Sequence, residues 1–235
     1  MSNIKPLGIK SYGSIGHLLG SKLGETDRYL NHGQHNICVT KTRDKNDLII
    51  VQEKYDGSNV GVCKVNGQIY PITRAGYIAN ESNFIQHHVF YDWVIRNKSV
   101  FNSILNEGER ISGEWLYQVH SLKYDITNNI PFIAFDMFNS HNERFTFELF
   151  TERIKHTNIQ MPNLLFIGNE SLAIDKALCY LDSTNTKEKE GVVYRVERKG
   201  KVDFLAKYVL PEFECGIYMR DEIYNIDKND ILDYE

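Results

Sequence analysis

Apolar residues occur in short runs that fit buried or half-buried strands. Residues 47–54, DLIIVQEK, place four consecutive apolar residues before a charged end, which is typical of a buried strand. Residues 59–65 and 68–75 alternate in polarity on either side of Asn66-Gly67, which is a strong signal for a tight turn. The pattern therefore predicts a strand followed by a β-hairpin.

Runs with helical spacing separate further strand-like runs. The predicted helices cover residues 82–106, 146–157 and 171–182. The predicted strands cover residues 109–117, 131–138 and 164–169, followed by a hairpin over residues 190–209 that turns at Lys199-Gly200. Residues 1–46 are rich in glycine, histidine and polar residues, so we expect mostly loop there. The mixture predicts an α+β fold with antiparallel sheets flanked by helices.

Composition adds an uneven charge to this picture. The 235 residues, 42% of them hydrophobic, suit one large domain or one domain with a small appendage. The net charge of −4 gives no strong basic field of the kind that attracts nucleic acid. Residues 211–235, however, hold eight acidic and two basic residues, which leaves residues 1–210 mildly basic. We therefore expect one domain over residues 1–210, able to hold a basic groove, and an acidic tail over residues 211–235.

The chain shows no sign of export or membrane insertion. Its N-terminus lacks the apolar core of a signal peptide, and no apolar run approaches the length of a membrane span. Cys38, Cys63, Cys179 and Cys215 are widely spaced, which favours reduced thiols. We expect an intracellular, cytoplasmic protein without a membrane partner.

The stretch EKYDGSNV, residues 53–60, raises a chemical question, because it ends a buried strand on Lys54. A lysine with an ordinary pKa of about 10.4 is a free amine in only about one molecule in two thousand at pH 7. A nucleophilic lysine therefore needs desolvation or neighbouring cations. Asp56 would share the face of Lys54 if the strand continued, and Gly57 permits a tight turn or a close ligand. The alternative is a surface lysine before an ordinary Asp-Gly turn.

Six segments, in this order, resemble the motifs of the covalent nucleotidyltransferases, the superfamily of ATP-dependent RNA and DNA ligases and mRNA capping enzymes. They are KYDG (54–57), TRAG (73–76), GEWL (113–116), FIAFDMF (132–138), EGVVYR (190–195) and LAKYV (205–209). Each motif is weak alone, but their order and their places on predicted strands make the signal specific. The resemblance implies a nucleotidyltransferase domain, an ATP-grasp-like ligase adenylation fold.

The resemblance also implies roles for catalytic residues. Lys54 would attack the α-phosphate of ATP and become lysyl-AMP, and Asp56 belongs to the same motif. Glu190 would hold the catalytic metal, Mg²⁺ or Mn²⁺, and Lys207 would contact the α-phosphate. Mg²⁺ suits a site with few carboxylates, because it completes its shell with water and phosphate oxygens. Without the resemblance, Glu190 would be an exposed acid opening a strand.

A second group of residues would bind the nucleotide. Glu53 is placed in the nucleotide site, Arg74 near the nucleotide phosphate and the RNA 5′-phosphate, and Glu114 on the ribose. Phe135 would stack on the purine, with Asp136 beside it. Two other aromatic residues of the same strand could stack instead, namely Phe132 and Phe138. Arg74 could also be an ordinary surface arginine on a hairpin.

One position departs from the family pattern. The last motif usually reads Lys-x-Lys, but Leu205 takes the first position and only Lys207 remains. Lys201 or Lys189 could supply the missing charge. The departure leaves strand sealing less secure than self-adenylylation.

The length after the last motif separates members of the superfamily. DNA ligases and capping enzymes continue into an OB-fold, a five-stranded barrel, whereas 28 residues follow Lys207 in this sequence. We therefore expect no OB-fold and an RNA ligase of the RNA ligase 2 type, in which an asparagine placed like Asn59 engages RNA ends. The expected partner is RNA with 5′-phosphate and 3′-hydroxyl ends. The sequence leaves the oligomeric state undetermined and is compatible with a partner subunit. The alternatives are a small DNA ligase or related transferase, and a non-catalytic subunit that binds nucleotide or RNA ends.

The segment before the first strand offers a second candidate site. His32, His35 and Cys38 follow one another at intervals of three, but a zinc site needs a fourth ligand or an open position. Residues 12–34 also resemble the lead-in of uncharacterised bacterial and phage RNA ligase-like proteins. The sequence assigns no role to this segment.

Overall fold

The chain forms two compact units, each built from separated stretches of sequence. The structure, a computed structural model, describes residues 4–126, 131–184 and 189–232. The first unit consists of residues 1–13, 57–161 and 216–235, and the second of residues 14–56 and 162–215. The chain passes from the second unit to the first between Asp56 and Gly57, within the KYDG segment.

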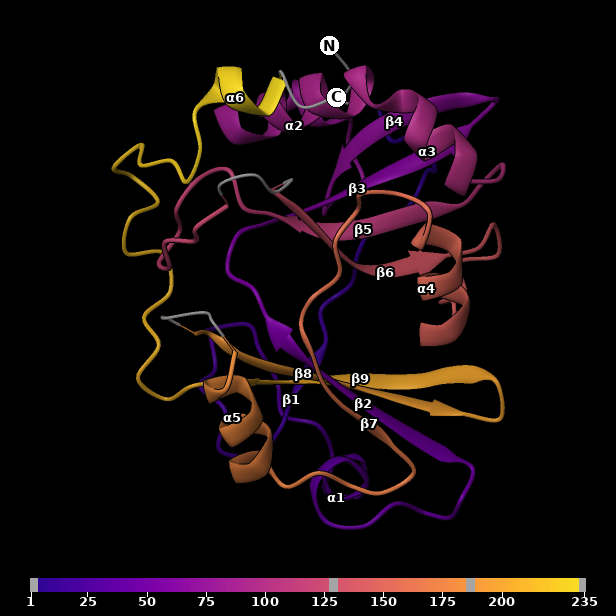
Figure 1. Cartoon of the computed structure of the whole chain (residues 1–235), viewed down its shortest axis with the longest axis vertical. Helices are drawn as coiled ribbons and strands as arrows, with labels where there is room; N and C mark the ends of the chain where they lie inside the picture. Colours follow the sequence, from indigo (N-terminus) through magenta and orange to yellow (C-terminus); the bar gives the residue numbers. More distant parts are fainter. Residues whose placement is uncertain (1–3, 127–130, 185–188, 233–235) are drawn as a thin grey trace. The chain divides into compact units, whose positions relative to one another are not determined.

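The first unit contains a four-stranded antiparallel sheet (Figure 1). Its strands, in spatial order, are β4 (Gln68–Thr73), β3 (Ser58–Val65), β5 (Arg110–Trp115) and β6 (Phe132–Phe138). The predicted hairpin is confirmed, because Asn66 and Gly67 connect β3 to β4 with φ values of 51° and 71°. Two positive φ values in a row are the signature of the turn that matches strand twist.

An aromatic core holds helices on one face of this sheet. The helices are η1 (Ala79–Glu81), α2 (Ile85–Arg96), α3 (Lys98–Ile104), α4 (Phe147–Ile154) and α6 (Lys228–Leu232). Phe90 and Trp93 of α2 pack against Trp115 and Phe132, with ring centroids 5.2–5.7 Å apart. The helix predicted over 82–106 is wrong in its extent, since it breaks at Asn97, whose side chain donates to the Trp93 carbonyl.

The second unit contains a five-stranded sheet. Its strands, in spatial order, are β1 (Gly16–His17), β9 (Lys201–Val209), β8 (Gly191–Arg198), β2 (Asp47–Lys54) and β7 (Leu164–Gly168). All pairs are antiparallel except the short β1, which runs parallel to β9. Within the described residues neither sheet closes into a barrel. The predicted α+β fold is confirmed, and each predicted strand is found.

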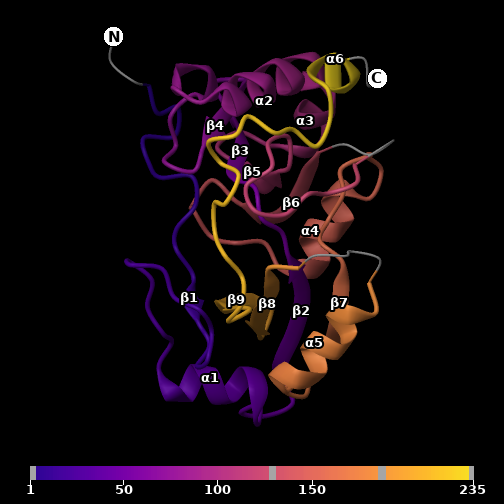
Figure 2. The same ribbon diagram turned by 90° about the vertical axis from the view of Figure 1, so that its left-hand side faces the viewer.

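Two helices cover one face of the second sheet, α1 (His32–Val39) and α5 (Ile174–Asp182) (Figure 2). Their buried residues pack with Ile49, Val51 and Tyr194 of the sheet. The expectation of mostly loop over 1–46 is wrong for β1 and α1. Asn31 starts α1 by accepting a hydrogen bond from the Gln34 N–H, a cap that no apolar periodicity accompanies.

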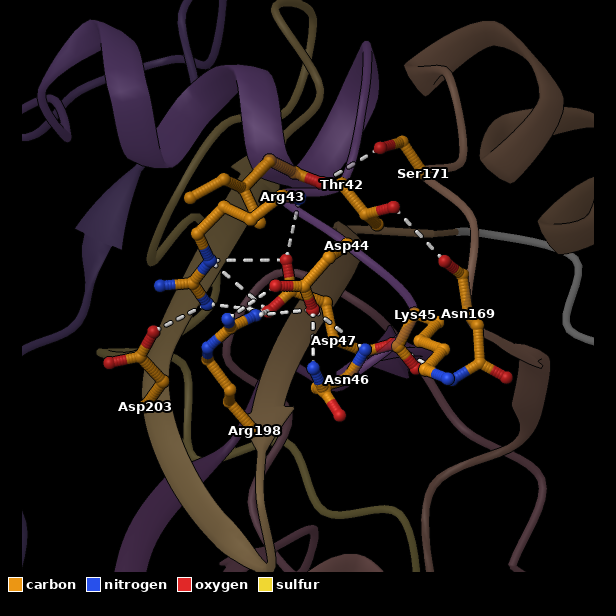
Figure 3. Close-up of polar contacts among 11 residues, drawn as sticks. Thr42, Arg43, Asp44, Lys45, Asn46, Asp47, Asn169, Ser171, Arg198 and Asp203 are labelled. Atoms are coloured by element: carbon orange, nitrogen blue, oxygen red, sulfur yellow. Dashed lines mark hydrogen bonds and ion pairs between the residues drawn. The ribbon is translucent and has the colours of Figure 1, made fainter.

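A cluster of ion pairs fastens the far end of β2 to the β8–β9 hairpin (Figure 3). Asp47 is fully buried and accepts from both Arg43 and Arg198, at 2.8 and 2.7 Å. Arg43 also reaches Asp203 on β9, and Arg198 reaches Asp44. Two arginines thus compensate one buried carboxylate, as a buried charge requires.

The acidic C-terminal segment is divided between the two units, since residues 211–215 belong to the second unit and residues from 216 onward belong to the first. Tyr224 stacks on Tyr117 with ring centroids 4.7 Å apart, and Ile231 is buried in the aromatic core. Asn225 donates to the Leu116 carbonyl at 2.7 Å. Asp233 and Glu235 lie outside the described residues.

The four cysteines form no disulfide. Cys38 and Cys63 are buried, whereas Cys179 and Cys215 are exposed. Among the described residues, no helix combines the length and apolarity that a membrane crossing needs.

Candidate functional site

Lys54 lies on the face of the second sheet opposite the α1–α5 core. Side chains alternate along a strand, so Ile49 and Val51 point into that core while Lys54 points away from it. Lys54 Nζ donates to Glu190 Oε2 at 2.5 Å. Only 21% of the Lys54 side chain and 8% of the Glu190 side chain are exposed. The predicted nucleophile and the predicted metal-binding acid therefore meet in a half-buried ion pair.

Gly191 allows this contact, because it pairs with Lys54 across β2 and β8 and places Glu190 next to it. Its φ of 153° lies in a region that L side chains rarely adopt. A Cβ atom at this position would run into the carbonyl oxygen of Tyr208 on β9. Only glycine permits so close an approach, so the Glu-Gly pair in EGVVYR has a steric reason.

Burial and mutual repulsion set the protonation of this cluster. The pKa of Glu190 is raised by burial and by the negative charge of Asp56, although the cation of Lys54 acts in the opposite direction. The pKa of Lys207 is lowered by burial and by the charge of Lys54, and Asp27 opposes both effects. The four predicted catalytic residues, Lys54, Asp56, Glu190 and Lys207, thus form one electrostatic group.

Lys207 shares the sheet face of Lys54, since it pairs with Val193 on β8, which in turn pairs with Gln52 on β2. On its other side, Lys207 pairs with His17 of β1. Its Nζ atom lies 3.3 Å from Asp27 Oδ1. The sequence did not connect His17 or Asp27 with Lys207, because nothing in it shows that β1 lies beside β9.

Leu205 is buried on the same face of β9 as Lys207. Its partner across β8 is Arg195, which forms an ion pair with Glu197 at 2.7 Å. Lys201 stands six residues from Lys207, a distance of about 20 Å along a strand. Lys189 is paired with Asp182 at 3.0 Å. The cation placed directly across from Leu205 is therefore Arg195, which sequence analysis overlooked.

Glu53 points to the opposite face of the sheet from Lys54, as adjacent strand residues must. It is buried and accepts a hydrogen bond from Asn163 Nδ2 at 2.7 Å. The hydroxyl of Tyr55 also bonds Glu53, and burial followed by this carboxylate raises the pKa of Tyr55. The structure thus does not bring the Glu53 and Lys54 side chains together.

In the first unit, Glu114 and Asn59 are cross-strand partners on β5 and β3. Glu114 accepts a hydrogen bond from the Gly57 N–H at 3.1 Å, and a Cβ on Gly57 would stand 2.7 Å from the Trp115 carbonyl oxygen. The Asn59 carbonyl accepts from the Arg74 N–H at 3.1 Å, which fixes the TRAG turn while the Arg74 side chain is exposed. Glu114, Asn59 and Arg74 are therefore brought together.

The aromatic residues of β6 differ in exposure. Phe132 and Phe138 are buried, whereas Phe135 is half-buried and meets Tyr12 edge-on at 5.0 Å. Asp136 is fully buried and accepts from Arg144 Nε at 2.6 Å and from the Tyr12 hydroxyl at 3.2 Å. Of these aromatic rings, Phe135 is the one with surface left for a base.

A metal at the Lys54 face would rely on few protein ligands. Among the described residues, no three His, Cys, Asp or Glu side chains gather as a metal site, so His32, His35 and Cys38 do not form one. Burial raises the pKa of the Cys38 thiol to about 12, as is ordinary for a buried structural cysteine. Asp56 lies near enough to Glu190 to raise the pKa of its carboxyl group. These two carboxylates fit a metal such as Mg²⁺, which takes one or two carboxylates and completes its shell with phosphate oxygens and water.

Solved ligase structures share this fold. A protein of Aquifex aeolicus described as an ATP-dependent DNA ligase superposes with a TM-score of 0.57 at 18% identity, covering 84% of this chain and 49% of its own. An archaeal ATP-dependent RNA ligase gives 0.52 at 16% identity, with 84% and 48% covered. An RNA ligase of Naegleria gruberi, solved with pyrophosphate, gives 0.53 at 18% identity, with 83% and 58% covered. The chain thus spans about half the length of these structures.

Sequence comparison points to one family. No curated protein sequence matches the chain. The family model of RNA ligases matches residues 47–209, from the first residue of β2 to the last residue of β9. This range contains Lys54, Glu190 and Lys207, and it covers more than half of the chain. The chain therefore belongs to the RNA ligase family.

Proposed function

We propose that this protein is an ATP-dependent RNA ligase that acts through a covalent lysyl-AMP on Lys54. The ion pair between Lys54 and Glu190, on the sheet face that also carries Lys207, is the observation that favours this function most. A lysine nucleophile must be a neutral amine, so Lys54 has to give up both its proton and its contact with the Glu190 carboxylate before it attacks.

The proposed ligation reaction has three steps. Lys54 Nζ, having released its proton, attacks the α-phosphorus of ATP, and the bond to the β-phosphate oxygen breaks to release pyrophosphate. The 5′-phosphate of RNA then attacks the same phosphorus, and the Lys54–phosphorus bond breaks as Lys54 Nζ takes up a proton and leaves as the amine. A 3′-hydroxyl finally attacks the RNA 5′-phosphorus, loses its proton and displaces AMP. Each step depends mostly on alignment and on charge near the phosphates.

Individual side chains supply these conditions. Lys207 offsets charge on the α-phosphate oxygens, and Lys54 must leave the Glu190 carboxylate before it can attack. Glu114 binds the ribose, and Phe135, which is half-buried, offers the remaining surface of its ring to adenine. Arg74 and Asn59 engage the 5′-phosphate end of the RNA. Bound Mg²⁺ or Mn²⁺, held by Glu190 with Asp56 nearby, would supply positive charge to the phosphate oxygens.

RNA is the proposed acceptor because the family match is to RNA ligases. DNA remains the second candidate, since the Aquifex aeolicus protein of similar fold is described as a DNA ligase. A comparison of 5′-labelled RNA and DNA strands, each with a 3′-hydroxyl partner strand, decides between them. We expect the RNA ends to be sealed faster.

The first test is covalent labelling. Wild type, Lys54→Ala and Lys176→Ala are incubated with ATP labelled on the α-phosphate and Mg²⁺, then separated by denaturing electrophoresis. Lys176 is an exposed lysine of α5 and serves as the matched control. We expect label on wild type and Lys176→Ala and none on Lys54→Ala. An unlabelled wild type, with ATP and with GTP and after pyrophosphate removal, would favour a non-catalytic subunit that binds nucleotide or RNA ends.

A further inference from the structure

A chain of polar contacts leads from β1 to Lys207 within the second unit. His17 Nδ1 lies 2.6 Å from Ser21 Oγ, and His17 Nε2 lies 3.0 Å from Asp27 Oδ2. The other oxygen of Asp27 faces Lys207 Nζ at 3.3 Å. His17 and Ser21 are almost completely buried, so this arrangement is built into the fold.

The backbone around β1 holds this arrangement in place. The His17 N–H donates to the Arg28 carbonyl, and the His17 carbonyl accepts from the Leu30 N–H, at 2.9 and 2.8 Å. Residues 28–30 therefore run alongside β1 while β9 lies on its other side. The loop between β1 and residues 28–30 places Asp27 next to the ammonium group of Lys207. The Gly24 N–H also donates to Asp27 Oδ2 at 3.1 Å.

One protonation pattern fits the two His17 contacts, of which the one to Asp27 is an ion-pair distance and not an aligned hydrogen bond. Ser21 Oγ accepts from the Val209 N–H at 2.9 Å, and its own proton faces His17 Nδ1 at 2.6 Å and the Lys22 carbonyl at 3.4 Å, of which the shorter contact favours His17. The remaining His17 proton then sits on Nε2 and faces Asp27. Burial and the charge of Lys207 lower the pKa of His17, which is consistent with a neutral ring. Although Ser21, His17 and Asp27 are the residue types of a hydrolytic triad, Ser21 is buried and bound to backbone, so it is no nucleophile.

We propose that Asp27, anchored by His17 and the Gly24 N–H, is a positioning residue that holds the ammonium group of Lys207 on the sheet face of Lys54. This inference rests on the proposed function, in which Lys207 meets the α-phosphate. An ammonium group has three N–H donors, so one contact to Asp27 leaves two for phosphate oxygens. Asp27 also opposes the burial and the Lys54 charge that lower the pKa of Lys207.

A double-mutant cycle on the rate of lysyl-AMP formation tests this role. We expect Asp27→Asn to slow single-turnover labelling about tenfold, within the range measured for contacting pairs. Lys207→Ala should slow it further, and the double variant should be no slower than Lys207→Ala alone. Asp27→Glu, which keeps the charge, should recover part of the lost rate. Asp203→Asn is the matched control, because Asp203 is a β9 carboxylate in an ion pair with Arg43.

A purely structural role of Asp27 gives a different result. The Asp27→Asn effect would then persist in the Lys207→Ala background, and Asp27→Glu would not recover it. Either outcome, or a wild-type rate for Asp27→Asn, overturns the inference while the proposed function stands.

A second readout needs no ligase activity. Lys207 acetylation by an N-hydroxysuccinimide ester, followed by peptide mass spectrometry with Lys176 as internal reference, reports directly on the ammonium group. We expect Asp27→Asn to raise Lys207 reactivity several-fold. Unchanged reactivity overturns the inference, whereas a wild type that forms no lysyl-AMP overturns only the proposed function.

Discussion

The ammonium group of Lys54 lies 2.5 Å from the carboxylate of Glu190, at the point where β2 and β8 pair through Gly191. The two residues are 136 positions apart in sequence. Their contact depends on the backbone of Gly191 as much as on the charges. The sheet therefore has to be formed before this ion pair can exist.

Gly191→Ala should destabilise the protein strongly. The new Cβ would meet the Tyr208 carbonyl oxygen, and φ is 153°, so we expect a loss of about 2–3 kcal/mol in the free energy of unfolding. Urea denaturation measures this loss. Gly200→Ala is the control, because Gly200 has a φ of 74° but nothing within 4 Å of an added Cβ. Its loss should stay near 1 kcal/mol, and equal losses would show that the Tyr208 contact is unimportant.

Phe135 and Phe132 should separate nucleotide binding from stability. Phe135→Ala should raise the ATP concentration needed for half-maximal labelling about tenfold, since base stacking is worth about 1–3 kcal/mol. Phe132→Ala, which empties a fully buried site, should instead cost about 3–5 kcal/mol of stability. ATP titrations and denaturation curves on both variants distinguish the two. Unchanged ATP dependence in Phe135→Ala would remove it from the nucleotide site.

His87 should make the protein less stable in mild acid. Burial, followed by the charges of His88 and His120, lowers the pKa of His87 to about 4. The folded state therefore favours the neutral ring, and its contribution is complete above pH 6.5, the unfolded pKa, and falls as the pH drops toward 4. The shift corresponds to at most about 3 kcal/mol at pH 4.

The check is denaturation at several pH values between 7 and 4. His87→Asn should flatten the pH dependence, because asparagine can keep the contact to Ser82 without titrating. His141→Asn, at an exposed histidine, should leave it unchanged. An undiminished slope in His87→Asn would assign the acid sensitivity to another group.

Alternation of side chains explains much of what the sequence predicted. The apolar runs gave β2, β8 and β9, and the Asn66-Gly67 and Lys199-Gly200 turns set the hairpins. The opposite orientation of Glu53 and Lys54 was available from the same alternation. The strand β1 could not be predicted in this way, because a strand of two residues shows no alternation of polarity. Asp27 reaches Lys207 only through that pairing, so this part of the candidate site required the three-dimensional structure.

Leu205, which stands where the family pattern has a lysine, shows another limit of prediction from sequence. A sequence reading looks for a substitute cation nearby along the chain, where Lys201 and Lys189 are found. Strand pairing instead places Arg195 across from Leu205, ten residues earlier in the chain. Register decides which side chains are neighbours, and register is fixed by tertiary packing.

The interleaving of the two units bears on how the protein is made. The second unit begins at residue 14, but its sheet includes β8 and β9. The sheet therefore cannot be completed until residue 209 has been synthesised. The first unit draws its outer strands, β4 and β6, from one central stretch, so most of its sheet can form earlier on the ribosome. Domains generally fold as units during synthesis, and pairings distant in sequence form slowly. Lys54 therefore leaves the ribosome 136 residues before Glu190, and their ion pair can form only after Glu190 and β8 have been synthesised.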